Sequence, residues 1–162
     1  MQRRLVFPIY ATVLATFNFS IGFPPSSFGA QEPACKVQIA RAGQSIDSLG
    51  AVVSEVVLGT NESPHNPFSG KESITFRLGS LSATKSAAKR SDDLMNSPAI
   101  QMRIAKQIFS ACTDMVEVRF NMTATDWDSS IFRGKDGAPI KGTCVDPVRE
   151  GAWPLWGFYA CL

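Results

Sequence analysis

A change of hydrophobic period near the middle of the chain predicts its central helix and strand. Residues 98–112 carry apolar side chains at three- and four-residue spacing, whereas most of the polar ones share the remaining face. Ser97 is placed to cap this helix with its hydroxyl, and Pro98 suits the first helical position. Residues 116–122 then alternate between apolar and polar side chains, which predicts a half-buried strand.

Shorter patterns on both sides predict the rest of a sheet. Residues 82–95 are rich in alanine and predict a short helix. An Asp-Gly turn at residues 134–137 predicts a hairpin between the segments that flank it. Residues 155–162 are apolar on both faces, as in a strand buried between neighbours. Besides the central strand, the predicted strands are residues 71–80, 129–133, 139–145 and 155–162.

The segment that precedes these elements has the weakest pattern. Val37 and Ile39 are placed to begin a strand. Residues 45–58 fit a helix by their spacing and a strand by their valines, so both interpretations stay open. Residues 60–70 are rich in proline, asparagine and serine, which predicts a loop.

Together these elements predict an α+β domain. We expect an antiparallel sheet with one main helix packed on one face, stabilised by disulfides. Residues 71–162 are expected to form its α+β part, and residues 31–70 are expected to form a poorly defined N-terminal segment. Together, residues 31–162 have the usual length of one domain.

Residues 1–30 predict a secretory signal peptide. Arg3 and Arg4 precede an uncharged apolar run that ends at Phe23, and small residues follow at Gly29 and Ala30. An uncleaved anchor is the alternative, because the run approaches the length of a bilayer-spanning helix. We therefore expect an exported protein, periplasmic or extracellular, that meets a membrane only if this segment is retained.

The small positive charge of the chain comes from that leader. The sequence has 16 Lys and Arg residues against 14 Asp and Glu, a net charge of +2, and Arg3 and Arg4 supply the excess. A neutral domain exerts no general attraction on nucleic acid or anionic lipid. Nucleic acid is therefore not an expected partner.

The chain has four cysteines: Cys35, Cys112, Cys144 and Cys161. An even number in an exported chain predicts two disulfides, and four cysteines allow three pairings between which the sequence does not choose. Neither a C-x-x-C nor an H-x-x-x-H spacing occurs, so no metal or cofactor is expected.

Candidate chemistry is sparse. The single histidine, His65, lies in a predicted loop and no G-x-S-x-G motif occurs, so no catalytic residue is assigned. Asp126 and Asp128 flank Trp127, which would suit a carboxylate pair beside a sugar-stacking ring. A capped turn and a core tryptophan would explain the same three residues. Trp153, in a predicted loop, is a further possible ligand contact.

Several short motifs follow one another in an order that resembles a group of small exported cyanobacterial proteins of unknown function. The resemblance covers about residues 72–162 and implies an exported domain, without implying an activity. The motifs are a helix ending at Cys112, V-x-V-x-F from Val116, Asp126-Trp127, Cys144-Val145 and Trp156-Gly157-x-x-x-Cys161.

These features predict a non-catalytic binding or structural module of the cell envelope or extracellular space, whose partner is a protein or an envelope ligand. One alternative is a small cell-envelope glycan hydrolase that uses Asp126 and Asp128. Another is a secreted protease inhibitor whose loop of residues 60–70 enters a protease.

Overall fold

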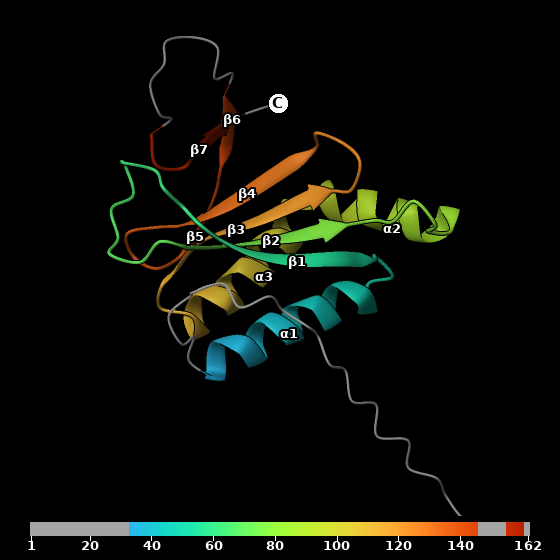
Figure 1. The fold of residues 1–162 in the computed structure, drawn as a ribbon, viewed down its shortest axis with the longest axis horizontal. Coiled ribbons are helices and arrows are strands. Elements are labelled where there is room, and N and C mark those ends of the chain that lie inside the picture. Colours follow the sequence, from blue (N-terminus) through green and yellow to red (C-terminus); the bar gives the residue numbers. More distant parts are fainter. Residues whose placement is uncertain (1–32, 146–154, 161–162) are drawn as a thin grey trace, which may run out of the picture.

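The computed structural model describes residues 33–145 and 155–160 (Figure 1). None of the helices in these two stretches is both long and apolar enough to cross a bilayer. The fold is α+β, as predicted. The elements in chain order are α1 (Pro33–Ser48), β1 (Val53–Thr60), β2 (Glu72–Leu78), α2 (Lys85–Met95), α3 (Pro98–Ala111), β3 (Met115–Met122), β4 (Asp128–Arg133), β5 (Pro139–Lys141), β6 (Thr143–Val145) and β7 (Phe158–Ala160).

Five strands form the main sheet in the order β1-β2-β3-β4-β5. Neighbouring strands are antiparallel except β2 and β3, which are parallel. Parallel strands need a long connection that returns the chain to the starting end, and α2 and α3 supply it. The strands β6 and β7 form a separate parallel pair. Figure 1 shows α1 and α3 on one face of the sheet and β6 and β7 on the other.

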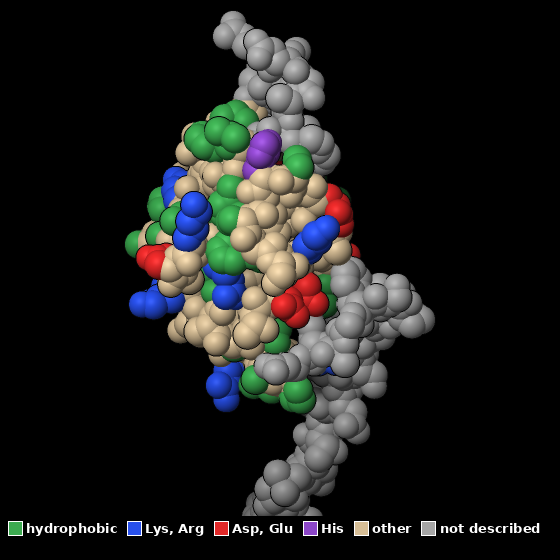
Figure 2. Space-filling view, turned by 90° about the vertical axis from the view of Figure 1, so that its left-hand side faces the viewer, with side chains coloured by type: hydrophobic (Ala, Val, Ile, Leu, Met, Phe, Trp, Pro, Cys, Tyr) green, Lys and Arg blue, Asp and Glu red, His purple; other side chains and the backbone are tan. Residues whose placement is uncertain are grey.

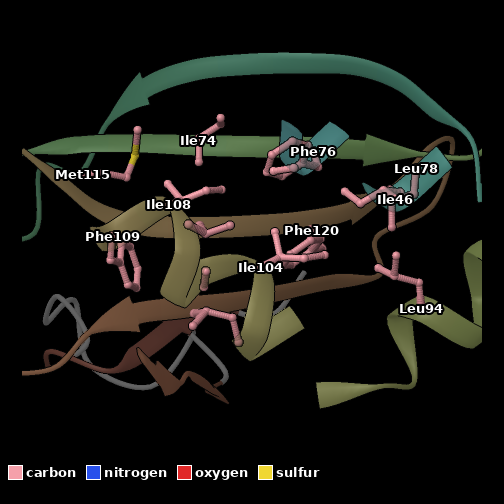
Figure 3. Close-up of a cluster of buried hydrophobic side chains, with 14 of the residues drawn as sticks. Ile46, Ile74, Phe76, Leu78, Leu94, Ile104, Ile108, Phe109, Met115 and Phe120 are labelled. Carbon is pink, nitrogen blue, oxygen red and sulfur yellow. The ribbon is translucent and has the colours of Figure 1, made fainter. Parts of the chain in front are cut away.

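The hydrophobic core lies between the sheet and the helices α1 and α3 (Figure 3). The apolar positions of β2 and β3 come into line across the parallel pair, and the rings of Phe76 and Phe120 stack with their centroids 5.8 Å apart. Ile104 and Ile108 of α3 belong to the same core cluster as this row, and so does Ile46 of α1. The core therefore uses two helices on one face, where the sequence predicted one main helix.

The helix α1 corrects the prediction for the N-terminal segment. Val37 and Ile39, placed to begin a strand, lie within a helix of 16 residues. Its buried residues are Cys35, Ala42 and Ile46, whose separations of seven and four residues have a helical period. The period was hard to detect because the buried stripe is narrow and Val37, outside it, is exposed.

Residues 45–58, for which the sequence left helix and strand open, contain the end of a helix and most of a strand. Helix α1 ends at Ser48 and strand β1 starts at Val53, so the helical spacing and the valine-rich strand pattern belong to different parts of the segment. Gly50, with a φ of 82°, allows the turn between them.

The C-terminal segment also differs from the prediction. Of the described residues 155–160, those at 158–160 form a strand, which pairs with β6 outside the main sheet, and Leu155 and Phe158 are exposed. The predicted strand 139–145 is divided at Gly142 into β5 and β6. A Cβ at Gly142 would lie 2.7 Å from the ring of Phe132 and 2.8 Å from the carbonyl oxygen of Ser130, so the chain turns where no side chain fits.

Both ends of α3 differ from what the sequence predicted. Ser97 precedes the helix, but its hydroxyl makes no capping hydrogen bond. At the other end, the guanidinium of Arg133 donates to the carbonyl oxygens of Phe109, Cys112 and Met115 at 2.8, 2.6 and 2.8 Å. The last carbonyls of a helix have no intrahelical partner, so Arg133 joins the end of α3 to β4.

Candidate functional site

Polar side chains gather on the outer face of the sheet, which is the face turned away from α1 and α3. Successive residues of a strand point to opposite faces, so β3, which buries Val118 and Phe120 against the helices, turns the intervening residues outward. These outward residues are Glu117, Arg119 and Asn121 on β3 and Asp128 and Ser130 on β4, in one antiparallel pair.

Glu117 is the centre of this group. It is only 3% exposed, although it lies on the polar side of its strand. Its carboxylate accepts hydrogen bonds from the Asn61 amide at 2.8 Å, the Ser130 hydroxyl at 2.8 Å and the Arg119 guanidinium at 2.9 Å. A buried carboxylate is tolerated when it is paired and hydrogen-bonded in this way.

Arg119 is fixed on one side and open on the other. Its Nε donates to the Ser130 hydroxyl and, with Nη2, to Glu117. Its Nη1 makes no hydrogen bond to any residue of the two described stretches, and 40% of the side chain is exposed. Burial by itself lowers the pKa of Arg119, but the charge and hydrogen bonds of Glu117, with the charge of Asp128, raise that pKa above its ordinary value. Arg119 is therefore a permanently charged, positioned donor.

A second set of polar contacts lies beside Arg119. Asn121 donates to the Asp128 carboxylate at 2.6 Å, and the Tyr159 hydroxyl donates to the backbone carbonyl of Asp128 at 3.1 Å. Tyr159 thereby attaches β7 to the start of β4. Burial raises the pKa of Tyr159, and the charge of Asp128 raises it further, against a smaller lowering by Arg119.

Tyr159 gives a pH-dependent prediction. Its pKa in the folded protein is raised above 10.0, so its contribution to stability is present below pH 10.0 and is lost as the pH rises through the raised value. We expect tyrosinate absorbance in a Tyr10→Phe protein, where Tyr159 is the one remaining tyrosine, to appear later than in the unfolded chain. Replacing Asp128 by Asn should bring the midpoint closer to that of the unfolded chain. Coincident titrations of folded and unfolded protein would contradict the prediction.

An aromatic cluster closes one end of the polar face. The ring of Trp156 packs edge-on against Phe132, at 5.0 Å between centroids, and against Phe68, at 5.9 Å. Its indole Nε1 donates to the carbonyl oxygen of Arg133 at 3.0 Å. The cluster joins the β1–β2 loop, β4 and the segment that leads into β7.

The candidates predicted from the sequence lie at the edge of this face. Asp126 is exposed in the β3–β4 loop and Asp128 begins β4, so they do not share one face of a regular strand. Trp127 is 37% exposed, and its backbone N–H donates to the hydroxyl of Thr125 in the turn. Trp153 lies outside the described residues. The geometry does not test the role proposed for these residues.

The four cysteines take no part in the hydrogen bonds described for Glu117 and Arg119. The prediction of a disulfide is confirmed by the bond between Cys35 on α1 and Cys112 after α3. Cys144 on β6 is also disulfide-bonded, and Cys161 lies outside the described residues. No cysteine in the described part of the chain is free.

The loop of residues 61–71 has a defined conformation held by its own polar side chains. Asn66 donates to the carbonyl of Gly70 and accepts from the backbone of Phe68, while Asn61 accepts from the backbone of Ser63. His65 is exposed at the tip of this loop.

Figure 2 shows that on this side of the molecule cationic and anionic side chains are scattered without a patch of one sign. Within the described stretches, no group of His, Cys, Asp and Glu side chains has an arrangement that could hold a metal.

The sequence did not single out Glu117, Arg119, Asn61, Ser130 or Tyr159. The alternation of β3 placed Glu117 and Arg119 on its polar side, which usually means solvent exposure. The only available signal was a strand with two opposite charges two residues apart on that side.

No protein-family model, curated protein or solved structure matched the chain.

Proposed function

We propose that this protein is an exported, non-catalytic binding module, and that its binding surface is the outer face of the sheet around Arg119. The observation that carries the proposal is the partly exposed side chain of Arg119. Its guanidinium is fixed by Glu117 and Ser130, while Nη1 makes no hydrogen bond to a described residue. A donor held rigidly before binding loses little conformational entropy when a ligand arrives.

The chemistry of Arg119 favours a ligand that carries a carboxylate. A guanidinium offers two parallel N–H groups that match the two oxygens of a carboxylate. Asn121 lies beside Arg119 on the same face and is a neutral polar neighbour. Because the carboxylates of Glu117 and Asp128 both act on Arg119, the local net charge does not attract an anion. Recognition would therefore depend on hydrogen-bond geometry, and we expect modest affinity.

Export is part of the proposal. The disulfide between Cys35 and Cys112 suits an oxidising compartment outside the cytosol, because such bonds are rare where thiols are kept reduced. The leader-like pattern of residues 1–30 and the resemblance to exported cyanobacterial proteins agree with it. The expected ligands are therefore acidic polymers or peptides of the envelope or extracellular space.

Calorimetric titration with paired polysaccharides tests the proposal, using one uronic-acid polymer and its carboxyl-reduced counterpart. We expect the purified protein to bind the acidic polymer and Arg119→Met to weaken binding at least about tenfold, since hydrogen bonds to charged groups contribute about 1.5–3 kcal/mol. Arg103→Met, at an exposed position of α3, is the matched control and should bind as the unaltered protein does. Equal binding by Arg119→Met and the unaltered protein would refute the assignment.

Measurements of polymer length and of protease inhibition separate the two alternatives. A hydrolase that uses Asp126 and Asp128 would shorten the polymer, and Asp126→Asn or Asp128→Asn would abolish the shortening. A protease inhibitor would bind through the loop of residues 60–70, so cutting that loop would remove inhibition and leave any binding by Arg119 intact.

A further inference from the structure

The two edges of the main sheet are protected to very different degrees. The edge strand β5 has three residues, begins with Pro139 and ends with Lys141, and each of these features discourages the addition of another strand. The opposite edge strand, β1, has eight residues without proline or lysine, and Glu55 is its one charged residue. A bulge near Val53 interrupts only its beginning. No other strand of residues 33–145 or 155–160 pairs with the free side of β1.

The hydrogen-bond ladder identifies the backbone groups on that free side. Asn61 donates from its backbone to the carbonyl of Lys71 at 2.6 Å, continuing the antiparallel register in which Thr60 pairs with Glu72. In an antiparallel pair, alternate residues direct their N–H and C=O groups toward the neighbouring strand. Val57 and Gly59, an even number of residues from Asn61, therefore bond to β2. The N–H and C=O groups of Val56, Leu58 and Thr60 point to the free edge.

From this edge we infer that two copies of the chain associate through β1, antiparallel, and form one continuous ten-stranded sheet. A two-fold axis at Val57 pairs Val56 of each copy with Leu58 of the other, so that the outward N–H and C=O groups of both residues are satisfied. This register keeps each residue on its own face of the sheet, and a register shift of one residue would not.

The side chains of β1 suit a second copy of itself. With the axis at Val57, the two Val57 side chains meet on the outer face, and apolar β-branched pairs of this kind stabilise sheets. Glu55 lies opposite Gly59 of the second copy, so the one charge of the strand meets no like charge, and Arg77 of its own chain already pairs with it at 2.9 Å. On the other face, Val56 and Leu58 are partly buried against the core and would gain cover from the same residues of the second copy.

Sedimentation equilibrium over a range of protein concentrations tests the inference on the protein as purified from its host. We expect the mass to rise from one copy to two copies with concentration. Val57→Lys, which places two like charges opposite each other at the axis, should weaken the association at least about tenfold. Ile140→Lys is the matched control, because Ile140 is an exposed apolar residue on the other edge strand. The Ile140→Lys protein should associate as the unaltered protein does.

Hydrogen exchange gives a second readout that does not depend on a substitution. The amides of Val56, Leu58 and Thr60 should become protected as the concentration rises, whereas those of Val57 and Gly59 should be protected at every concentration. A mass of one copy throughout, or a dimer that Val57→Lys leaves intact, would overturn the inference. Protection of the three amides by an extended peptide of another protein, with the mass of a single copy retained, would also overturn it and assign the edge to a heterologous strand.

Discussion

Replacing Cys35 and Cys112 together by alanine is expected to lower the free energy of unfolding by about 4 kcal/mol. The bond joins residues 77 positions apart, and the entropy that a cross-link removes from the unfolded chain grows with the length of the loop it closes. Both cysteines are almost fully buried, at 2% and 3% exposure, so their small apolar side chains can be replaced by alanine without burying a polar group. Denaturant unfolding followed by circular dichroism measures the loss.

The remaining two cysteines supply the control for that experiment. Once Cys35 and Cys112 are joined, Cys161 is the partner left for Cys144, and their bond would close a loop of roughly 17 residues, worth about 3 kcal/mol by the same entropy argument. The Cys144→Ala, Cys161→Ala protein should therefore be the more stable of the two double variants. If the variant that lacks Cys35 and Cys112 unfolded at the same denaturant concentration as the unaltered protein, the expected stabilisation by this disulfide would be contradicted.

Replacing Glu117 by leucine is expected to cost about 3–5 kcal/mol, which is typical when one partner of a buried ion pair is removed. Two buried donors, the Asn61 amide and the Ser130 hydroxyl, would lose their acceptor, and the Arg119 guanidinium, whose side chain is 40% exposed, would lose its charged partner. The cost comes from these unsatisfied donors more than from the lost attraction. Thermal and denaturant unfolding both report it.

A double-mutant cycle separates the two sources of that cost. If the unpaired Arg119 is the main penalty, Glu117→Leu with Arg119→Met should be more stable than Glu117→Leu alone, because no charge is then left without a partner. Strictly additive losses would contradict the view that Glu117 and Arg119 act as one unit. Glu117→Gln, which keeps an acceptor oxygen, should lie between the unaltered protein and the leucine variant.

The elements with a continuous apolar pattern could be predicted from the sequence alone. The strand β2, the helix α3, the strand β3 and the hairpin from β4 to β5 all occur where period and turn chemistry placed them. In each, neighbouring residues along the chain carry the whole signal, so no distant contact is needed to interpret it. Disulfide bonding was also predicted without any distant contact, from the number of cysteines and the leader-like pattern of residues 1–30.

The candidate site could not be predicted in this way, because its parts are distant in sequence. Asn61 meets Glu117 across 56 positions and Tyr159 meets Asp128 across 31. On the polar side of β3 and β4, Asn61 after β1 and Tyr159 of β7 complete the hydrogen-bond network. A periodic pattern reports which side of a strand is polar, but it carries no information about what covers that side.

The sequence by itself determined the helix–strand centre of the chain, its disulfide character and the class of fold. The tertiary structure alone decided that β2 and β3 run parallel, that α1 shares the core with α3, that Cys35 pairs with Cys112 and that β1 lies at an edge. The physical reason is that the two kinds of feature depend on interactions over different distances along the chain. Periodicity records how each residue partitions between core and water locally, whereas strand order and the burial of Glu117 depend on which distant segments close over one another.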